Sequence, residues 1–322
     1  MTEPELVVRF TEADARRALL ADARAGLTDT PKWASPKWFY DAEGSELFER
    51  ITELPEYYQT RAESGILHRR AVEIAELTGA RTLVELGSGS SEKTRLLLDA
   101  LRKNEMLQRF VPLDVSVSAL RAAIDSIALD YPELEVRGVV DDFTAGTSVP
   151  DGPERLVAFL GGTIGNLLPS ERARFHASVR AALEPGEWLL LGTDLVKDPE
   201  RLVRAYDDAQ GVTGEFNRNV LRVLNRETGA DFDPAAFDHV ARWNAEQEWI
   251  EMRLRARRAM EVRLAEPPLR VEFEAGEELR TEVSAKFRRE RVRDELDAAG
   301  FDLHRWWVDD GGDFALSLAR AR

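Results

Sequence analysis

The chain contains no cysteine and only four histidines among its 322 residues. The absence of cysteine excludes disulfide bonds, thiolate zinc sites and a cysteine nucleophile. The histidines, His68, His176, His239 and His304, lie far apart and show no metal-ligand spacing, so we expect no metal site. The sequence also lacks a Gly-x-Ser-x-Gly motif, which leaves serine-hydrolase chemistry without support.

Long apolar runs and positive charge are scarce as well. No apolar run approaches the roughly 20 residues that cross a bilayer, and the opening Met-Thr-Glu-Pro-Glu lacks the features of a signal peptide. The net charge of −15 opposes binding to a phosphate backbone and favours solubility. We therefore expect a cytoplasmic protein with no nucleic-acid and no membrane partner. Its length allows two domains with buried cores.

The most informative stretch is RTLVELGSGSSEKT, residues 81–94. An apolar run ends in Glu85, turns at Gly87 and Gly89, and enters a segment rich in Leu. This order predicts a β-strand, a tight turn and a helix N-terminus, where backbone N–H groups converge on a bound ligand. A dinucleotide, a nucleoside triphosphate or S-adenosylmethionine could be that ligand. A turn that only reverses the chain is the structural alternative.

The residue at position 92, a glutamate, discriminates among these three candidate ligands. A dinucleotide site needs a third glycine at this position, in the pattern Gly-x-Gly-x-x-Gly. A phosphate-binding loop needs a glycine directly before Lys93 and Thr94, and a carboxylate there would face the phosphates. S-adenosylmethionine has no phosphate; Glu85 suits its ammonium group and Lys93 could reach its carboxylate. The loop therefore favours S-adenosylmethionine.

From residue 82 onward the sequence alternates short apolar strands with helices. Strands are predicted at about 82–86, 110–114, 136–140, 155–160, 188–193, 302–308 and 314–319. Helices are predicted at about 92–103, 118–130, 170–183 and 288–299. This order predicts an α/β fold whose seven-stranded sheet is largely parallel and covered on both faces.

Ligands of such sheets bind beyond the carboxyl ends of the strands, and polar residues follow several strands here. Asp114 ends the second strand, where an acidic residue accepts hydrogen bonds from ribose hydroxyls. Asp142 and Phe143 follow the third strand and suit the amino edge and the face of adenine. The fourth strand runs into Gly161-Gly-Thr-Ile-Gly-Asn166. A single acidic strand end is more often solvated, but its recurrence favours a site.

Two regions fall outside this sheet. Residues 251–287 alternate apolar and polar side chains, which predicts an antiparallel sheet, and the first 60 residues read as helical. We therefore predict two domains. One comprises residues 61–196 and 287–322; the other, of α+β type, comprises residues 1–60 and 197–286.

Eight segments match one known family: PKWFYDAEGSELFERIT, LPEYYQTR, VELGSGSSEKT, FLGGTIGNL, LGTDLVKD, RLVRAYDDA, FNRNVL and TEVSAKF. They span about residues 30–290. On these segments the chain resembles the histidine-specific Nα-methyltransferases that make hercynine in ergothioneine biosynthesis. Two departures are visible, because Gly162 and Ala285 stand where the family pattern has Ser and Cys. Neither change should alter the chemistry.

The resemblance implies an enzyme that transfers three methyl groups to the α-amine of L-histidine, each from one S-adenosylmethionine. It implies a Rossmann-like, class I S-adenosylmethionine-dependent methyltransferase fold for the first domain, while the second domain binds the substrate. It implies no metal. Two domains of this size can work as a monomer, and no coiled-coil heptad appears, so we expect a monomer.

The matching motifs also imply the site residues. Those implied for the donor site are Tyr40, Gly87, Lys93, Asp114, Asp142 and Phe143. Those implied for the histidine site are Tyr57, Gly161, Asn166, Tyr206, Glu282 and Ser284. Tyr40 and Tyr57 are the implied catalytic residues: Tyr57 would lie beside the reacting amine, and both rings would shelter the growing alkylammonium.

Glu282 and Ser284 carry the expected specificity. They are two apart on a predicted strand, so both side chains face the same side. A carboxylate and a hydroxyl can bracket the two imidazole nitrogens, and a buried pair would reject amino acids that lack them. Asn166 and Tyr206 can donate hydrogen bonds to the substrate carboxylate. Without the resemblance, an exposed polar strand face would be the favoured explanation of Glu282 and Ser284.

Two other functions stay open at this point. The protein could be a methyltransferase for another amino acid or small amine, although an enzyme for aromatic amino acids would not need a carboxylate at position 282. It could instead bind S-adenosylmethionine without turnover, as a sensor. The presence of Tyr57 and Asn166 argues against a sensor.

Overall fold

The computed structural model describes residues 4–89, 91–103, 106–142 and 149–322. The chain forms two compact units. The first unit comprises Met1–Thr11, Gln59–Val196 and Lys286–Arg322, and the second comprises Glu12–Tyr58 and Lys197–Ala285. Each unit has an apolar core of its own.

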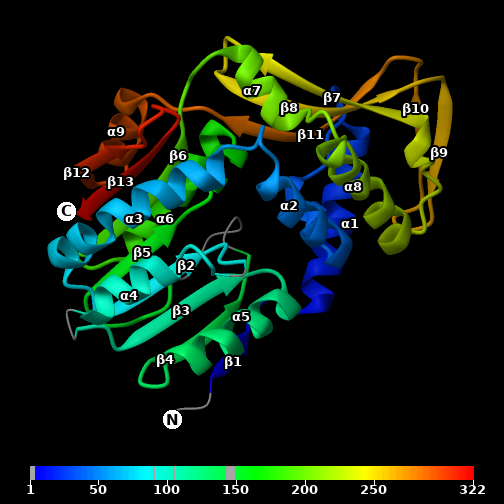
Figure 1. The fold of residues 1–322 in the computed structure, drawn as a ribbon. Helices are drawn as coiled ribbons and strands as arrows, with labels where there is room; N and C mark the ends of the chain where they lie inside the picture. Colours follow the sequence, from blue (N-terminus) through cyan, green and yellow to red (C-terminus); the bar gives the residue numbers. More distant parts are fainter. Residues whose placement is uncertain (1–3, 90, 104–105, 143–148) are drawn as a thin grey trace. The chain divides into compact units, whose positions relative to one another are not determined.

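The first unit is built on an eight-stranded sheet with the strand order β1-β4-β3-β2-β5-β6-β13-β12 (Figure 1). The strands are β1 (Glu5–Val8), β2 (Thr82–Leu86), β3 (Arg109–Asp114), β4 (Glu135–Val140), β5 (Arg155–Phe159), β6 (Trp188–Asp194), β12 (Phe301–Val308) and β13 (Phe314–Ala321). Strands β1 to β6 pair in parallel, whereas β13 pairs antiparallel with β6 and with β12. All seven predicted strands are present, and the predicted Rossmann-like α/β sheet is confirmed.

Strand β1 differs from the prediction, which had only helix in the first 60 residues. It lies at the edge of the sheet, where Glu5 pairs with Arg137 and Val8 with Val140 of β4. A strand of four residues is too short for an alternating pattern to be visible, and its partner lies far along the chain. Because of this pairing, the segment up to Thr11 groups with the first unit.

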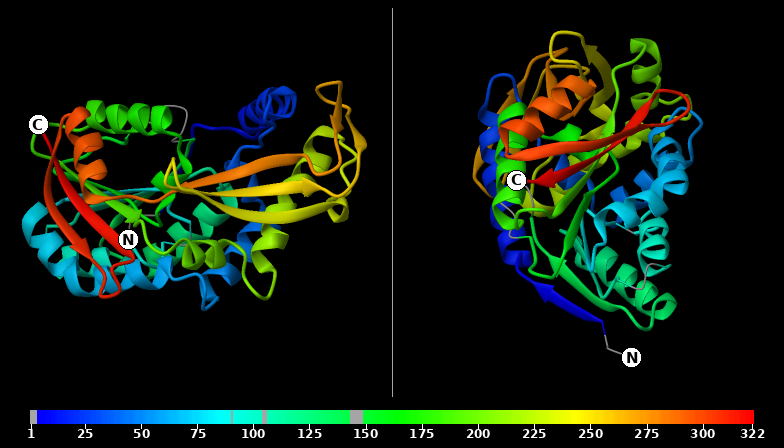
Figure 2. Two further views of the ribbon diagram at one scale, coloured as in Figure 1. Left: turned by 90° about the horizontal axis from the view of Figure 1, so that it is seen from above. Right: turned by 90° about the vertical axis from the view of Figure 1, so that its left-hand side faces the viewer.

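Helices cover both faces of this sheet. They are α3 (Gln59–Thr78), α4 (Arg95–Lys103), α5 (Val117–Asp130), α6 (Pro169–Ala182) and α9 (Arg289–Ala298). Helix α3 packs against α4, and α6 packs against α9; Figure 2 shows α6 and α9 on one face of the sheet and α3 on the other. Every residue of β2, β5 and β6 is buried, as expected for strands covered on both sides. This packing on both faces therefore holds the carboxyl ends of these strands in place.

The second unit combines helices with antiparallel strands. Its helices are α1 (Glu12–Thr28), α2 (Ala42–Glu53), α7 (Pro199–Tyr206) and α8 (Val212–Thr228). Its strands are β7 (Phe237–Asn244), β8 (Trp249–Ala256), β9 (Met260–Leu264), β10 (Leu269–Phe273) and β11 (Glu278–Ala285). They form a three-stranded sheet, β11-β8-β7, and a two-stranded sheet, β10-β9, all antiparallel. The antiparallel sheet predicted from alternation is thus confirmed.

A β-bulge interrupts strand β11. Arg280 pairs with Arg253 and Glu282 pairs with Met252, so Thr281 is an extra residue without a partner position on β8. A bulge of this kind twists its strand and redirects the side chains that follow. Glu282 and Ser284 come directly after it.

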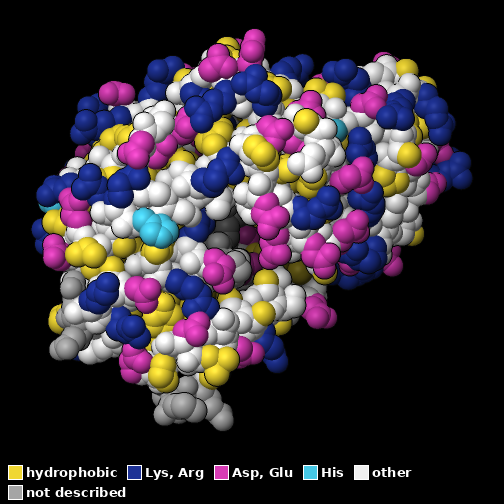
Figure 3. Space-filling view, in the orientation of Figure 1, with side chains coloured by type: hydrophobic (Ala, Val, Ile, Leu, Met, Phe, Trp, Pro, Cys, Tyr) yellow, Lys and Arg dark blue, Asp and Glu magenta, His cyan; other side chains and the backbone are white. Residues whose placement is uncertain are grey.

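Charges of both signs are mixed over the surface. On the face drawn in Figure 3, Lys and Arg side chains are interspersed with Asp and Glu. Some of them pair, as Arg16 does with Glu266 in the second unit and Arg95 with Asp130 in the first. In the described part of the chain, no helix has both the length and the apolar character that crossing a bilayer requires.

Candidate active site

A left-handed turn follows strand β2. Gly87 and Gly89 have φ values of 66° and 50°, a region that favours glycine. The N–H of Gly87 donates to the carbonyl of Leu113 on β3 at 2.8 Å, and the N–H of Gly89 donates to Asp114 Oδ2 at 3.0 Å. A side-chain carbon at Gly89 would meet no atom of the described residues within 4 Å, so the positive φ, and not a lack of space, accounts for this glycine. The outer side of the turn is open to a ligand.

Glu85 holds this turn to the start of α4. It is buried, and its two oxygens accept hydrogen bonds from the hydroxyls of Thr94 and of Ser91, the latter at 3.2 Å. Burial raises the pKa of the Glu85 carboxyl to about 7, and the hydroxyl hydrogen bonds oppose that rise. The sequence predicts Glu85 as a partner for the donor's ammonium. In the structure it faces its own loop, because a buried carboxylate needs donors close by.

Glu63 is a site residue that sequence reasoning missed. It lies on α3, is 0% exposed, and pairs with the ammonium of Lys93. The N–H of Gly161 donates to both of its oxygens, at 2.8 and 3.0 Å. A side chain at Gly192 on β6 would collide with it, since a Cβ there would lie 2.2 Å from Glu63 Oε1. Glu63 therefore links the loop after β2, which carries Lys93, to the turn after β5.

Only one feature of the sequence pointed toward Glu63: it follows the family segment LPEYYQTR by two positions. Its role depends on residues from three other parts of the sequence. Lys93, predicted to reach a donor carboxylate, is bound to Glu63 by one of its N–H groups. An ammonium carries three donors, so this contact is compatible with the predicted one.

Asp114 stands at the carboxyl end of β3. Its oxygens accept from the N–H of Gly89 and the N–H of Ser116, each at 3.0 Å. Burial raises the pKa of the Asp114 carboxyl, and these N–H groups oppose the rise. The N–H of Asp141 donates to the Asp114 carbonyl at 3.1 Å, which joins the ends of β3 and β4. Asp142 follows and is buried, whereas Phe143 lies outside the described residues.

The turn after β5 uses two left-handed glycines. Gly161 and Gly162 have φ values of 77° and 70°, so glycine at 162, where the family pattern has Ser, suits the backbone. The 3-10 helix η3 (Thr163–Asn166) begins directly afterwards and ends with the half-buried Asn166. The structure therefore brings Gly161 to Glu63 and Lys93, and places Asn166 one helical turn away.

The charge around the carboxyl ends of the parallel strands fits a cationic ligand. Four carboxyl groups lie here against the ammonium of Lys93, those of Glu63, Glu85, Asp114 and Asp142, and they outnumber it although Glu85, with its pKa raised to about 7, is only partly ionised at neutral pH. A nucleotide with two or three phosphates would meet an excess of like charge here. A donor with a sulfonium and an ammonium group, an uncharged ribose and a single carboxylate fits these residues.

The second unit holds the residues implied for imidazole binding. Glu282 and Ser284 are 8% and 7% exposed, so the alternative of an exposed polar strand face is wrong. They pair with Met252 and Ile250 of β8 in unbroken register, so they share one face of β11. The hydroxyl of Tyr206, at the end of α7, lies 2.8 Å from Ser284 Oγ. Three of the implied residues thus meet inside one unit.

Tyr40 and Tyr57 belong to an aromatic cluster of the second unit. Phe48 lies between them, with its ring centre 5.6 Å from that of Tyr40 and 6.1 Å from that of Tyr57, both edge to face. Tyr40 also contacts Phe216 at 5.6 Å. Tyr57 is buried, whereas Tyr40 is 40% exposed. Sequence reasoning missed Phe48 and Phe216, which fix the orientation of the two tyrosine rings.

The predicted site residues divide between the units. Gly87, Lys93, Asp114, Asp142, Gly161 and Asn166 lie in the first unit; Tyr40, Tyr57, Tyr206, Glu282 and Ser284 lie in the second. Each of these two sets of residues is held by contacts within its own unit. Among the described residues, no group of three or more His, Asp or Glu side chains could hold a metal ion.

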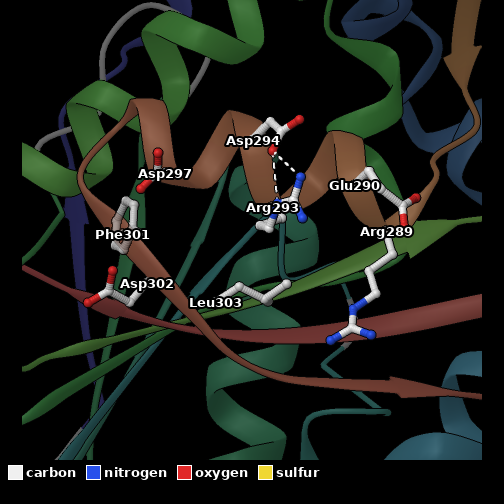
Figure 4. Close-up of a pocket in the computed structure, with 8 residues that line it drawn as sticks. All are labelled: Arg289, Glu290, Arg293, Asp294, Asp297, Phe301, Asp302 and Leu303. Carbon is white, nitrogen blue, oxygen red and sulfur yellow. Dashed lines mark hydrogen bonds and ion pairs between the residues drawn. The ribbon is translucent and has the colours of Figure 1, made fainter.

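A separate hollow of the first unit lies along α9 and the beginning of β12 (Figure 4). Charged residues of both signs line it, and Arg293 pairs with Asp294 of the same helix. It contains none of the predicted site residues. The amino end of a strand is also not where sheets of this type bind ligands.

A family model described as "Histidine-specific methyltransferase, SAM-dependent" matches residues 19–321. The chain belongs to this family. A histidine N-alpha-methyltransferase of Mycolicibacterium smegmatis is 58% identical over 97% of this chain and 98% of its own length. A histidine N-alpha-methyltransferase of Mycobacterium tuberculosis is 57% identical over 94% of each chain. The family resemblance inferred from the sequence is therefore confirmed, and the protein is an S-adenosylmethionine-dependent methyltransferase.

A more distant relative is named for another substrate. A 4-dimethylallyltryptophan N-methyltransferase of Arthroderma benhamiae is 26% identical over 97% of this chain and 96% of its own length. Its name describes N-methylation of an amino acid with another side chain.

Proposed function

We propose that this protein transfers three methyl groups from S-adenosylmethionine to the α-amine of L-histidine, forming hercynine for ergothioneine biosynthesis. Its family and its similarity to histidine N-alpha-methyltransferases support this function. The structural observation that carries it is the buried group Glu282, Ser284 and Tyr206. In this group a carboxylate and an oriented hydroxyl stand two positions apart on one strand face.

This group suits an imidazole ring. The Glu282 carboxylate accepts the N–H of one ring nitrogen, and the Ser284 hydroxyl exchanges a hydrogen bond with the other. The Tyr206 hydroxyl, 2.8 Å from Ser284 Oγ, limits the directions in which that hydroxyl can point. A side chain without ring nitrogens would desolvate these groups and return no hydrogen bonds, which costs affinity. Histidine is therefore favoured over apolar and aromatic amino acids.

The first unit supplies the donor site in this proposal. S-adenosylmethionine, when bound, supplies a methyl group already activated on a sulfonium. Gly87 and Gly89 let the backbone approach the ligand, Asp114 accepts hydrogen bonds from ribose hydroxyls, and Lys93 binds the donor carboxylate. Asp142 accepts from the adenine amino group, and Phe143 is proposed to cover its face. These residues orient the methyl group for in-line attack rather than changing its reactivity.

The substrate amine must attack as the neutral base, so it has to lose a proton before each transfer. Asn166 and Tyr206 are proposed to hold the substrate carboxylate, which leaves the amine as the mobile end. Tyr57 stands beside this amine. The ring faces of Tyr40 and Tyr57 stabilise the alkylammonium as methyl groups accumulate. Such stabilisation does not depend on N–H donors, so it persists through the third transfer.

Mass spectrometry tests the function directly. Incubation of the protein with L-histidine and S-adenosylmethionine should yield histidine with three additional methyl groups, all placed on the α-nitrogen by fragmentation. Methylation at the ring, or no methylation of histidine under conditions that saturate the donor, would contradict the proposal.

A second candidate is N-methylation of another amino acid, favoured by the relative named for 4-dimethylallyltryptophan. A competition assay with equal L-histidine and L-tryptophan separates the two functions. Predominant trimethylhistidine supports the first proposal, and predominant methylated tryptophan supports the second.

We further propose that the enzyme is a cytoplasmic monomer that needs no metal. One chain carries both groups of site residues, so no second copy is required to complete them. Light scattering of the active enzyme should give the mass of a single chain, and a chelator should leave the rate unchanged.

A further inference from the structure

Helix α7 ends at Tyr206, and its end is held by a histidine. The last carbonyl groups of a helix have no partner within the helix. The Tyr206 carbonyl accepts a hydrogen bond from His239 Nε2, on β7, at 2.8 Å. His239 thus fixes the backbone of a residue whose hydroxyl contacts Ser284.

Asn217 connects His239 to the bulge of β11. It lies on α8 and is fully buried. Its Nδ2 lies 2.8 Å from His239 Nδ1 and 3.1 Å from the carbonyl of Arg253, and its Oδ1 lies 2.5 Å from the hydroxyl of Thr281. Thr281 is the bulged residue and directly precedes Glu282. One chain of hydrogen bonds therefore joins the end of α7 to the strand that carries Glu282 and Ser284.

Two carbonyl groups determine how the Asn217 amide is oriented and which ring nitrogen of His239 carries a proton. The Arg253 carbonyl can only accept, so the Asn217 group facing it is the NH₂ group. That NH₂ group also faces His239 Nδ1, which must then accept. The Tyr206 carbonyl also only accepts, so His239 Nε2 carries the proton. The pattern is satisfied by the neutral imidazole alone; protonation at Nδ1 would place two donors against each other.

We propose that His239 and Asn217 are positioning residues for histidine binding, and that this role requires a neutral His239. The inference rests on the proposed function. It adds that Tyr206 and the Glu282–Ser284 strand are held in one geometry by a network that an acid pH opens. Neither His239 nor Asn217 is among the residues proposed to contact a ligand.

The surroundings of His239 agree with a neutral ring. Burial is the largest influence and lowers the pKa of the His239 imidazole; the hydrogen bond to the Tyr206 carbonyl raises it, and the guanidinium of Arg218 on α8 lowers it. Asp207, whose Oδ1 lies 4.0 Å from Nε2, and Asp208 act in the opposite direction from the end of α7. On β8 the residue opposite is the apolar Leu254. The ring is therefore neutral at neutral pH and becomes protonated below the usual range of histidine.

The first experiment compares two substitutions of His239. In His239→Gln the amide oxygen can accept from Asn217 and the amide nitrogen can donate to Tyr206, with no titration. His239→Leu keeps apolar volume and removes both hydrogen bonds. Calorimetry measures the affinity for S-adenosylhomocysteine, and then for L-histidine at saturating S-adenosylhomocysteine. We expect His239→Leu to weaken histidine binding about tenfold or more, corresponding to loss of one to two hydrogen bonds.

The donor side is the internal control. S-adenosylhomocysteine affinity should change less than about threefold in both variants, and His239→Gln should keep histidine affinity within about threefold of wild type. Thr281→Val, which removes only a hydroxyl, should weaken histidine binding in the same direction. It also serves if His239→Leu does not fold, as judged by its circular dichroism.

The second arm uses pH. The substrate titrates identically for every variant, so the ratio of wild-type to His239→Gln affinity isolates His239. Because burial lowers the pKa of His239, this ratio should stay constant near neutral pH and should fall only as the pH drops below 6.5, the usual pKa of histidine.

Three outcomes overturn the inference: unchanged histidine affinity in both His239→Leu and Thr281→Val, equal loss of both ligands, or a ratio that does not vary with pH. Wild-type trimethylation of histidine is measured beforehand. Its failure would refute the proposed function, and the inference with it, whereas normal wild-type activity with unaffected variants would refute the inference alone.

Discussion

At the scale of single residues, the site is made of buried polar groups whose hydrogen bonds leave them few alternatives. Glu63, Glu85 and Asp114 face donors of the chain itself, and Ser284 faces Tyr206. Removing one member of such a group leaves its partner desolvated, and that cost usually exceeds the strength of the hydrogen bond itself. Substitutions should therefore have local and separable effects.

Glu282→Ala should weaken histidine binding by about 10- to 100-fold, because a hydrogen bond to a charged group contributes about 1.5–3 kcal/mol. Donor affinity should stay nearly unchanged, since the residues assigned to the donor lie mostly in the first unit. Calorimetry with each ligand measures both values. Glu272→Ala, which removes an exposed carboxylate from β10, is the matched control. Equal losses for the two ligands would count against the imidazole role of Glu282.

Lys93→Met should destabilise the protein by about 2 kcal/mol, because it leaves the carboxylate of Glu63 buried without its cation. Lys93 is 26% exposed, which holds this effect below that of a fully buried pair. Adding Glu63→Gln should restore most of the lost stability, since Gln can still accept from Gly161 N. Urea unfolding of the two single variants and the double variant measures the coupling.

The control for this pair is Arg70→Met. Arg70 pairs with Glu73 on the exposed side of α3 at 3.1 Å, and exposed pairs contribute about 0–1 kcal/mol. Additive effects of the Lys93 and Glu63 substitutions would show that the two side chains do not act as a pair.

At the scale of elements, α7 illustrates how a short helix can present a functional side chain. It has eight residues, fewer than an isolated helix needs, so its ends must be held. Asp198 caps its N-terminus by accepting from the N–H of Arg201 at 2.9 Å, and Pro199 occupies its first position. Tyr206 therefore occupies a defined place although the helix is short.

Asp198→Ala should cost about 1 kcal/mol of stability, the usual effect of losing an N-cap. Asp198→Asn retains a capping oxygen and should change stability by less than about 0.5 kcal/mol. Urea unfolding compares the two variants with the wild type. The same loss from both substitutions would mean that charge, and not capping, is what α7 needs from this residue.

At the scale of the whole molecule, stability should depend on pH through buried ionisable groups. His176, on α6, is 2% exposed, and neither ring nitrogen has a hydrogen-bond partner among the described residues. Burial lowers the pKa of His176 from 6.5 to about 4. The unfolded chain thus binds a proton at higher pH than the folded protein does. His176 therefore contributes no penalty above pH 6.5 and destabilises the fold as the pH falls toward 4.

His176→Leu should remove this penalty, which grows as the pH falls below 6.5 and reaches about 3 kcal/mol near pH 4. Urea unfolding between pH 7 and pH 4 should show a shallower loss of stability in the variant. His68→Gln changes an exposed histidine of α3 and should follow the wild type. Parallel curves for wild type and His176→Leu would contradict the assignment.

Local signals in the sequence were enough to predict the first unit apart from strand β1. Strand and helix periodicity, and the glycines at 87 and 89, are local signals, and seven strands follow from them within a residue or two. The placement of Gly87, Asp114 and Asp142 at one edge of the sheet follows too, because the carboxyl ends of neighbouring parallel strands meet there, while their role in donor binding stays a prediction. The family motifs indicated the residues of the second unit by resemblance alone.

Tertiary structure decided what depends on contacts between distant segments. The burial of Glu63 requires α3, the loop after β2, the turn after β5 and a glycine on β6 to converge. The bulge at Thr281 is visible only against the register of β8, and His239, isolated in the sequence, acquires a role only beside Asn217 and Tyr206. Periodicity reports which face a residue occupies; it carries no information about which polar group from elsewhere in the chain will lie within hydrogen-bonding distance.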